Sequence, residues 1–429
     1  MLLNHMTRRV SLVAILCLAF MASARADDLR LRAELALEID LKQSSTCPIT
    51  CTVIITNKGD RSFAYWCGGP GLYPAASVVT ATIKDAAGKV LPVQVTNGQY
   101  EQGSGTPKVI PAGKEVRVPI AFRLPQAGPY TVSFASPLGW CESKGQKIIF
   151  WPAMQLASPV AIEVVDENTL VQERVDELLQ NVRAGSEFAI HVAAQYPVEP
   201  LLDKLVSDLL SVKPLVVASA ARVLEECEKR PRGVDRVVSQ AISRRLDWAV
   251  RYAKRNISII VNEQYKLNRR SLDRLGWLAA ELGTDVALEG VLVLANSEHT
   301  PPNIVHHLGK FRQERAMQAL AKFTTHFSAE RRFNAASYLA KNHNDAGLDI
   351  LLNSARNEQD PYSDSALSAL RNFPDNSDAE QVLREASQSK IPRRKEQAAL
   401  FLQDFLRARR NRSPNKEQPQ GPATPDQLR

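Results

Sequence analysis

Three segments carry one helical pattern at a fixed interval: SAERRFNAASYLAK at 328–341, SDSALSALRNF at 363–373 and KEQAALFLQDFL at 395–406. In each segment a pair of small or apolar residues precedes a leucine by three positions. The pairs are Ala335-Ala336, Ala366-Leu367 and Ala398-Ala399, followed by Leu339, Leu370 and Leu402. The pairs are 31 and 32 residues apart, and second helices with apolar stripes at 348–355 and 379–386 lie between them. This period predicts a stacked α-solenoid over 328–406 in which Leu339 and Leu370 belong to a continuous core.

The first 26 residues have the features of a cleaved secretory signal. Arg8-Arg9 form a positive start, residues 10–22 an apolar run, and Ala24-Arg25-Ala26 a small-residue cleavage site. Elsewhere no stretch approaches the roughly 20 apolar residues of a membrane-spanning helix. We therefore expect cleavage near Ala26 and export to the periplasm or the medium, and we do not expect an integral membrane protein.

From Leu29 to Leu41 apolar and polar residues alternate, which is typical of a strand with one face in water. The same period returns at 51–56, 78–83, 116–124, 130–134, 147–150 and 160–164. Turn-forming residues separate these runs, and no helical pattern interrupts them. They predict an antiparallel β-sandwich over residues 27–165. As a class of fold, it resembles the immunoglobulin-like sandwiches common in secreted bacterial proteins.

At Asp166 the period changes to that of helices, and strand patterns do not return. After a first helical pattern starting near Val171, apolar helices are predicted at 198–211, 214–228, 234–252, 271–282, 285–295, 302–310 and 313–325. We therefore predict an α-solenoid of about six helix pairs over 166–411. The tail 412–429 is rich in proline and polar residues, which predicts disorder.

The segment Arg332–Leu339 has the arrangement Arg-x-x-Ala-Ala-x-x-Leu and precedes the leucine-rich segment 348–352. It resembles the short bacterial form of HEAT repeats, and Ala220–Leu224 is a weaker match. The resemblance covers mainly residues 313–406. It implies an interaction surface formed by paired helices. The tetratricopeptide and ankyrin signatures are absent from the sequence.

Six cysteines occur in the sequence, one of them inside the predicted signal. The remaining five are Cys47, Cys51, Cys67, Cys141 and Cys227. The first four lie in the predicted sandwich of an exported chain, which favours disulfides, and Cys227 is expected to be a buried thiol. Cys67–Cys141 is the preferred bridge because a tryptophan precedes each cysteine. In an extended strand Cys47 and Cys51 would be roughly 13 Å apart, so their bonding would require a bend at Pro48.

The sequence contains none of the short motifs of hydrolases, phosphate-binding loops, zinc proteases or calcium loops. We therefore predict no catalytic residues, no cofactor and no metal site. The densest group of histidines is His299, His306, His307 and His326. Adjacent histidines on a helix point about 100° apart, so surface or interhelix positions are favoured over a metal site. In the segment 66–71, glycines suit a disulfide-anchored loop better than a phosphate site.

The formal charge is +8, and it falls to +5 when Arg8, Arg9 and Arg25 are removed with the signal. Between Lys229 and Arg274 there are 13 basic and four acidic residues. Such a stretch is usually a solvated helix face. Its alternative is a groove for an acidic polysaccharide, lipid headgroup or acidic protein of the cell envelope. The candidate residues are Arg244, Arg245, Arg251, Arg255, Arg269, Arg270 and Arg274.

These observations predict an exported, non-enzymatic scaffold or adaptor that binds protein partners through its solenoid, with no role in nucleic-acid binding. Two alternatives belong to other classes. One is an envelope hydrolase whose site, at the junction of the domains, uses no short motif. The other is a carbohydrate-binding module in which aromatic side chains of the sandwich stack on sugars. Its candidate residues are Trp66, Tyr73, Trp140 and Trp151.

Overall fold

A computed structural model describes most of the chain after residue 32. The described residues are 33–40, 42–60, 62–65, 80–93, 95–97, 108–136, 139–141, 148–150, 154–155, 159–255 and 263–412. Several predictions concern residues outside these ranges: the signal, the tail beyond Arg412, Cys67, and the aromatic residues Trp66, Tyr73 and Trp151. The side chains of Trp140, Cys141 and Arg255 also lie outside the described part.

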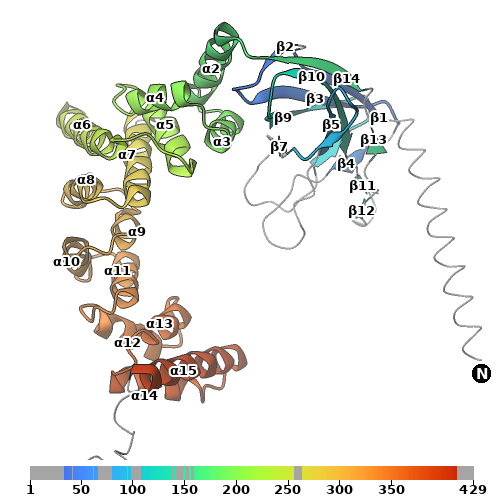
Figure 1. The fold of residues 1–429 in the computed structure, drawn as a ribbon. Coiled ribbons are helices and arrows are strands. Elements are labelled where there is room, and N and C mark those ends of the chain that lie inside the picture. The colour runs from blue at the N-terminus through green and yellow to red at the C-terminus, as the bar shows by residue number, and fades with distance from the viewer. Residues whose placement is uncertain are drawn as a thin grey trace, which may run out of the picture. The chain divides into compact units, whose positions relative to one another are not determined.

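The N-terminal half of the described chain forms three sheets (Figure 1). The first contains, in order, β1 (Ala33–Glu38), β3 (Ile49–Asn57), β9 (Glu115–Phe122) and β7 (Val95–Asn97). The second contains β2 (Lys42–Ser44), β14 (Val160–Val165), β10 (Gly128–Ser136), β5 (Thr80–Lys84) and β6 (Val90–Leu91), with β13 (Met154–Gln155) paired to β10. The third contains β12 (Ile148–Phe150), β11 (Gly139–Cys141), β4 (Phe63–Tyr65) and β8 (Lys108–Ile110).

Side chains from the first two sheets meet in one hydrophobic core. Val53 and Ile55 of β3 and Phe122 of β9 belong to the same buried cluster as Val132 and Phe134 of β10. The alternation along each strand explains this arrangement, because every second side chain points to the same face. The period-two pattern in the sequence therefore identified the buried face of the main strands.

Strand pairing differs from the prediction at β2. This strand pairs with β14 in parallel, with Lys42 opposite Glu163 and Ser44 opposite Val165. The expectation of a wholly antiparallel arrangement is wrong at this edge. Three residues with no alternating apolar pattern gave no signal of a strand, and parallel pairing brings together segments that are distant in the sequence.

After β14 ends at Val165 the chain is helical. The first helices are α2 (Asn168–Arg183), α3 (Glu187–Gln195), α4 (Glu199–Asp208) and α5 (Pro214–Glu226). They belong with the sheets to one compact unit, Met1–Arg232, and the second unit is Gly233–Arg429. The change from strands to helices thus falls at the predicted position, whereas the division into compact units falls at residue 232. The sequence analysis did not predict α3.

The second unit contains the remaining helices. They are α6 (Val234–Arg255), α7 (Glu263–Leu282), α8 (Asp285–Ala295), α9 (Ile304–Gly309), α10 (Glu314–Phe323), α11 (Ala329–Lys341), α12 (Leu348–Arg356), α13 (Ser363–Leu370), α14 (Ser377–Ala386) and α15 (Pro392–Arg412). Each makes its main contacts with helices one or two places away in the chain. Contacts of this kind define an α-solenoid, and Figure 1 shows these helices following one another from yellow-green to red. No helix within the described ranges is long and apolar enough to cross a membrane.

The repeat pattern places its small residues in the core, with one exception. Ala336, Ala366 and Ala398 are fully buried, as are Leu339 and Leu370. In α15, however, Ala399 is exposed and Leu402 is only half-buried, while Phe405 is fully buried. The prediction that Leu339 and Leu370 belong to the core is therefore confirmed. Leu402 differs from them because the last helix of a solenoid has a neighbour on one side only.

Candidate functional site

The basic residues predicted to form one surface do not share an environment. Arg244, Arg251, Arg269 and Arg270 are exposed, and Arg274 is half-buried. Arg245 is only 4% exposed. Its guanidinium lies 3.4 Å from Oδ1 of Asn268, and burial lowers its pKa. The assignment of Arg245 to a binding surface is wrong, because the side chain lies inside the α6–α7 interface.

His307 fills the interior of the α7–α9 interface. It is fully buried, and its ring lies at the edge of the Trp277 ring, with centroids 5.0 Å apart. It packs so closely on Gly276 that a Cβ at that position would overlap the imidazole. Burial holds the pKa of His307 down at about 3, and the charges of His306 and Lys310 act in the same direction. His307 is therefore neutral at physiological pH and inaccessible to a substrate.

Asp273 of α7 lies beside His307, with Oδ1 3.4 Å from Nε2. Its other oxygen accepts a hydrogen bond from Asn303 at 3.1 Å, and burial raises its pKa. The short distance to a carboxylate would by itself favour protonation of His307. Removal of the imidazole from water disfavours the protonated form, and this desolvation is the larger effect. His307 and the partly buried Asp273 thus form a polar contact within the α7–α9 interface.

The other histidines contact aromatic or polar side chains. The hydroxyl of Tyr338 lies 3.0 Å from Nδ1 of His306, and that of Tyr265 lies 3.2 Å from Nδ1 of His299. The first contact joins α9 to α11, and the second joins α7 to the connection before α9, in agreement with the favoured interhelix positions. No group of three or more His, Cys, Asp or Glu side chains suitable for a metal ion occurs in the described part of the chain.

Three of the cysteines are buried, free thiols: Cys47, Cys51 and Cys227. Burial raises the pKa of all three, that of Cys51 to about 12 and that of Cys227 to about 11. Their reactive thiolate forms are therefore disfavoured at neutral pH. The pairing of Cys47 with Cys51, which the sequence left open, does not occur, and the preferred Cys67–Cys141 bridge stays a prediction.

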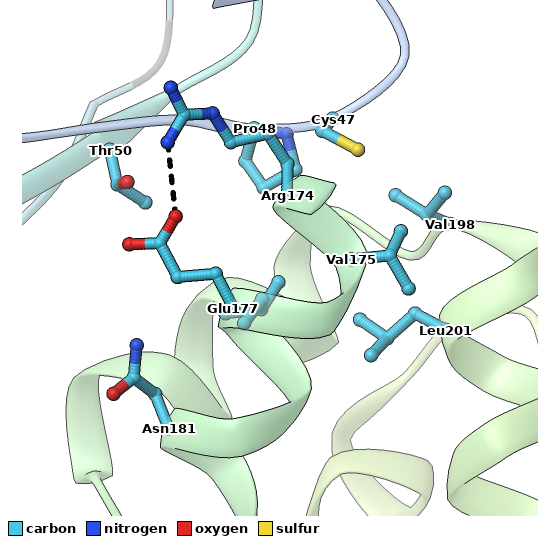
Figure 2. A pocket seen from close by; sticks show the side chains of 10 residues that line it. Cys47, Pro48, Thr50, Arg174, Val175, Glu177, Asn181, Val198 and Leu201 are labelled. Carbon is cyan, nitrogen blue, oxygen red and sulfur yellow. Dashed lines mark hydrogen bonds and ion pairs between the residues drawn. The ribbon is translucent and has the colours of Figure 1, made fainter. Parts of the chain in front are cut away.

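A small cavity lies beside Cys47 (Figure 2). Its lining on one side comes from the start of β3 and the residues before it, with Cys47, Pro48 and Thr50. On the other side Val175 of α2 and Leu201 of α4 line it. The thiol of Cys47 donates to the backbone oxygen of Val171 at 3.7 Å. With a volume of about 30 Å³ the cavity holds little more than a water molecule. It is a packing feature of the first unit and too small for a ligand.

A larger groove lies between α11, α12 and α13 in the second unit, with a volume of about 340 Å³. It is lined by Ala329, Arg332, Phe333, Ile350, Ser354, Asn357, Gln359, Asp360, Pro361 and Tyr362. Its apolar wall is the stacked pair Phe333–Tyr362, with ring centroids 4.6 Å apart and an angle of 16° between the planes. The remainder of the lining is mixed: it includes aliphatic side chains, amides, one guanidinium and one carboxylate. Such a groove suits an extended peptide with one apolar side chain.

Short-range hydrogen bonds fix the loops around this groove. Oδ1 of Asn357 accepts from the backbone N–H of Gln359 at 3.0 Å, and Oδ1 of Asp360 accepts from that of Tyr362 at 2.8 Å. These Asx turns position the segment between α12 and α13. The groove is therefore formed before a ligand arrives, which limits the ordering penalty of binding.

Phe327 lies in the connection before α11, two residues ahead of the groove-lining Ala329, and 90% of its surface is exposed. Its ring is tilted by 32° against that of His326, with centroids 4.2 Å apart. Arg332 donates to the backbone oxygens of His326 and Phe327 at 2.8 and 2.9 Å, which holds this loop against the start of α11. Phe327 and the groove therefore lie at the same end of α11.

This groove and its residues were not predicted from the sequence. Arg332 and Phe333 were recognised only as parts of a repeat pattern, and Phe327 was not recognised. One available signal was an aromatic residue in a short polar connection between two helices. The other was the segment Asn357–Pro361, whose side chains are typical of turns.

No protein-family model matches the chain, and no curated protein matches it. Among solved structures, a PapD-like domain of human CEP192 is similar at 9% identity, over 32% of this chain and 87% of that one, with a TM-score of 0.19. A designed armadillo repeat protein in complex with the peptide (KR)4 is similar at 14% identity, over 56% and 94%, with a TM-score of 0.26. Human deoxyhypusine hydroxylase in complex with glycerol is similar at 16% identity, over 55% and 90%, with a TM-score of 0.24. At these TM-scores the similarities identify neither a family nor a ligand.

Proposed function

We propose that the mature protein is an exported scaffold, without catalytic activity of its own, that binds an extended segment of a partner protein in the groove between α11, α12 and α13. The observation that carries this proposal is the 340 Å³ groove with the 90% exposed Phe327 beside it. Both features lie on a solenoid, whose stacked helices form an extended binding surface.

The chemistry of the groove favours binding over catalysis. Its lining contains one carboxylate, Asp360, and one hydroxyl group of the serine type, Ser354. Asp360 accepts a backbone hydrogen bond within its own turn, and no histidine lines the groove. Hydrolysis through a serine nucleophile requires an adjacent base, and the lining contains no such pair of residues.

The finer fold assignments belong to the same proposal. The shared core of two sheets supports an immunoglobulin-like sandwich, and the buried Ala335-Ala336 pair in α11 supports HEAT-like repeats.

For the exported state we propose a Cys67–Cys141 disulfide. Mass analysis after alkylation without reduction should then count three thiols in the mature chain, those of Cys47, Cys51 and Cys227. Five labelled thiols would contradict the bridge.

The groove is tested with peptides selected from a phage-displayed dodecapeptide library on the full mature protein. Affinity for each enriched peptide is then measured by fluorescence anisotropy on wild type, Phe327→Ala and Leu400→Ala. Leu400 is the matched control, because it is a 61% exposed apolar residue of α15 and does not line the groove. We expect about tenfold weaker binding for Phe327→Ala, since aromatic residues dominate such contacts, and no change for Leu400→Ala.

A third variant tests the interior of the groove. Ile350→Arg introduces a long charged side chain into the lining, and its folding is checked by thermal unfolding. Loss of binding in a folded Ile350→Arg protein supports the proposal. Peptides that bind wild type, Phe327→Ala and folded Ile350→Arg equally would place the binding surface elsewhere.

A further inference from the structure

Residues 413–429 carry an apolar stripe with a period of three. Pro419, Pro422, Pro425 and Leu428 follow one another at intervals of three residues, whereas Pro414 falls outside this register. A polyproline II helix has three residues per turn, so residues at this interval lie on one side of it. Because proline fixes its own φ angle near that of this helix, such a segment loses less entropy than an ordinary chain when it binds. The sequence pattern is thus that of a ligand for an aromatic groove.

The groove between α11, α12 and α13 has the chemistry that such a ligand requires. Pro361 and the half-buried Tyr362 line it, and the stack of Tyr362 on Phe333 forms a flat apolar wall. Aromatic walls of this kind bind proline-rich segments. A polyproline II helix also leaves its backbone carbonyls without internal partners. Among the described residues, neither the amide nitrogen of Asn357 nor the hydroxyl of Tyr362 has a hydrogen-bond acceptor, so both can donate to these carbonyls.

Helix α15 connects the groove to residues 413–429. At its start the buried Arg394 donates to Oγ of Ser363 and to the backbone oxygen of Ala355. Both residues are neighbours in sequence of groove-lining residues, and Ser363 directly follows Tyr362. The helix then continues to Arg412. One end of α15 is therefore fixed beside the groove, and residues 413–429 follow its other end.

The lengths of the two segments match. From Arg394 to Arg412 the helix advances about 27 Å at 1.5 Å per residue. Pro422 lies ten residues beyond Arg412, which is about 31 Å of polyproline II chain at 3.1 Å per residue. The middle of the stripe can therefore return along α15 to the groove, whereas Pro414, two residues beyond Arg412, is too close to the helix end to reach it.

Building on the proposed function, we infer that residues 419–428 of the same chain occupy the groove between α11, α12 and α13 and that a partner segment must displace them. The stripe packs on Tyr362 and Pro361, and Asn357 and Tyr362 donate to its backbone carbonyls. Covalent attachment gives the stripe an effective concentration on the order of 1 mM at the groove. A contact that is weak by itself therefore competes with the partner, so the groove selects partners that bind more strongly than the stripe.

The contact itself is tested by photo-crosslinking in the full mature protein. p-Benzoylphenylalanine replaces either Gln359, which lines the groove, or Leu400, which is exposed on α15. Leu400 is the matched control, because it lies closer to Arg412 along the helix than the groove does. After trypsin digestion, we expect the peptide 417–429 to be crosslinked to position 359 at least about fivefold more than to position 400, since docking concentrates it at the groove. Equal yields at the two positions would overturn the inference.

The competition is tested with the peptides selected for the proposed function. Their affinity is measured on the full mature wild type, on a variant with Pro419, Pro422 and Pro425 changed to alanine, and on Pro414→Ala. Pro414→Ala is the matched control, because it removes a proline outside the register. We expect the triple variant to bind the peptides about threefold to tenfold more tightly than wild type, since the attached competitor is weakened. Pro414→Ala should bind like wild type, and equal affinity of all three proteins would contradict the competition.

The outcomes separate this inference from the proposed function. A crosslink from position 359 to residues 417–429 without any enriched peptide would support the contact within the chain and overturn the partner. Enriched peptides that bind all three proteins equally, with no preferred crosslink, would overturn the contact within the chain and leave the groove as a binding site. Crosslinks that join two chains, seen as a covalent dimer on a denaturing gel, would assign the stripe to a second copy and overturn the inference.

Discussion

Two helix interfaces of the solenoid bring backbones close at a glycine, and they differ in what packs against it. In the interface between α11 and α12, a Cβ on Gly347 would lie 2.6 Å from Cα and Cβ of Ala336. In the interface between α7 and α9, a Cβ on Gly276 would overlap the His307 ring. The first interface is apolar, whereas the second encloses an imidazole and a carboxylate. Repeats with apolar interfaces leave a period in the sequence, and the polar interface does not.

The largest effect is expected from a charge placed in the apolar interface. Leu339→Asp puts a carboxylate at a fully buried position of α11 and should lower the free energy of unfolding by more than about 4 kcal/mol. Leu402→Asp is the matched control, because Leu402 occupies the equivalent repeat position in α15 and is half-buried. Urea unfolding measures both. A Leu402→Asp protein as unstable as Leu339→Asp would show that the last helix is packed like the internal ones.

Alanine substitutions at the two glycines test whether the two interfaces differ in rigidity. Gly347→Ala should destabilise by about 1–3 kcal/mol, because the new Cβ meets the backbone of α11, which cannot move alone. In an open helix, glycine to alanine would instead stabilise by about 1 kcal/mol. In Gly276→Ala the new Cβ meets the His307 side chain, which can shift more easily than a backbone. The decrease in the free energy of unfolding should therefore be smaller than in Gly347→Ala. Thermal unfolding that ranks Gly276→Ala below Gly347→Ala in stability would mean that His307 is held as rigidly as a backbone.

Much of the fold follows from local patterns in the sequence. Alternation identified the buried faces of β3, β9 and β10, and the 31-residue period placed Leu339 and Leu370 in the core. Features that depend on distant contacts did not follow. The parallel pairing of β2 with β14 requires the fold before it can be recognised. Arg245 looks like its exposed neighbour Arg244 in the sequence, and only the position of α7 buries it.

The candidate site was less accessible to prediction than the fold. None of the described side chains among the seven basic residues predicted to form a binding surface lines the groove between α11, α12 and α13. The wall of that groove forms because α11 packs against α13, which brings Phe333 onto Tyr362. Phe327 is a candidate contact residue because its side chain is exposed, and the loop that exposes it is held by the hydrogen bond from Arg332. These properties depend on packing between repeats, and residue type alone does not give them.

The polar interface should be recognised by its pH dependence. The pKa of His307 is about 3 in the folded protein, against an ordinary 6.5 when unfolded. As the pH falls from 6.5 toward 3, the unfolded chain takes up a proton that the folded protein does not, so stability is lost. At pH 5 the loss from this group is about 2 kcal/mol. Asp273, whose pKa is raised by burial, takes up its proton at a higher pH in the folded state and opposes the loss at the acid end.

The measurement is urea unfolding at pH 7 and pH 5 for wild type and His307→Leu. The variant loses the histidine without adding a titratable group, so its stability should fall by about 2 kcal/mol less than that of wild type over this interval. The stability of the variant at pH 5 is compared with its own stability at pH 7, because the effect of leucine on packing is the same at both pH values. An unchanged difference between pH 7 and pH 5 would mean that His307 is protonated within the folded protein.

The smallest effect is expected from the exposed ion pairs that link neighbouring helices, such as the pair between the end of α13 and α15. Arg371 and Asp404 lie 3.6 Å apart, with about half of each side chain exposed. Such a pair contributes below about 1 kcal/mol, and Arg371 also covers the Phe401 ring at 5.6 Å, a contact that does not need Asp404. A double-mutant cycle with Arg371→Met and Asp404→Asn should therefore give a coupling free energy below about 1 kcal/mol that decreases further in high salt. A larger coupling would mean that the ion pairs hold the repeats in register. A small one assigns that role to the apolar interfaces.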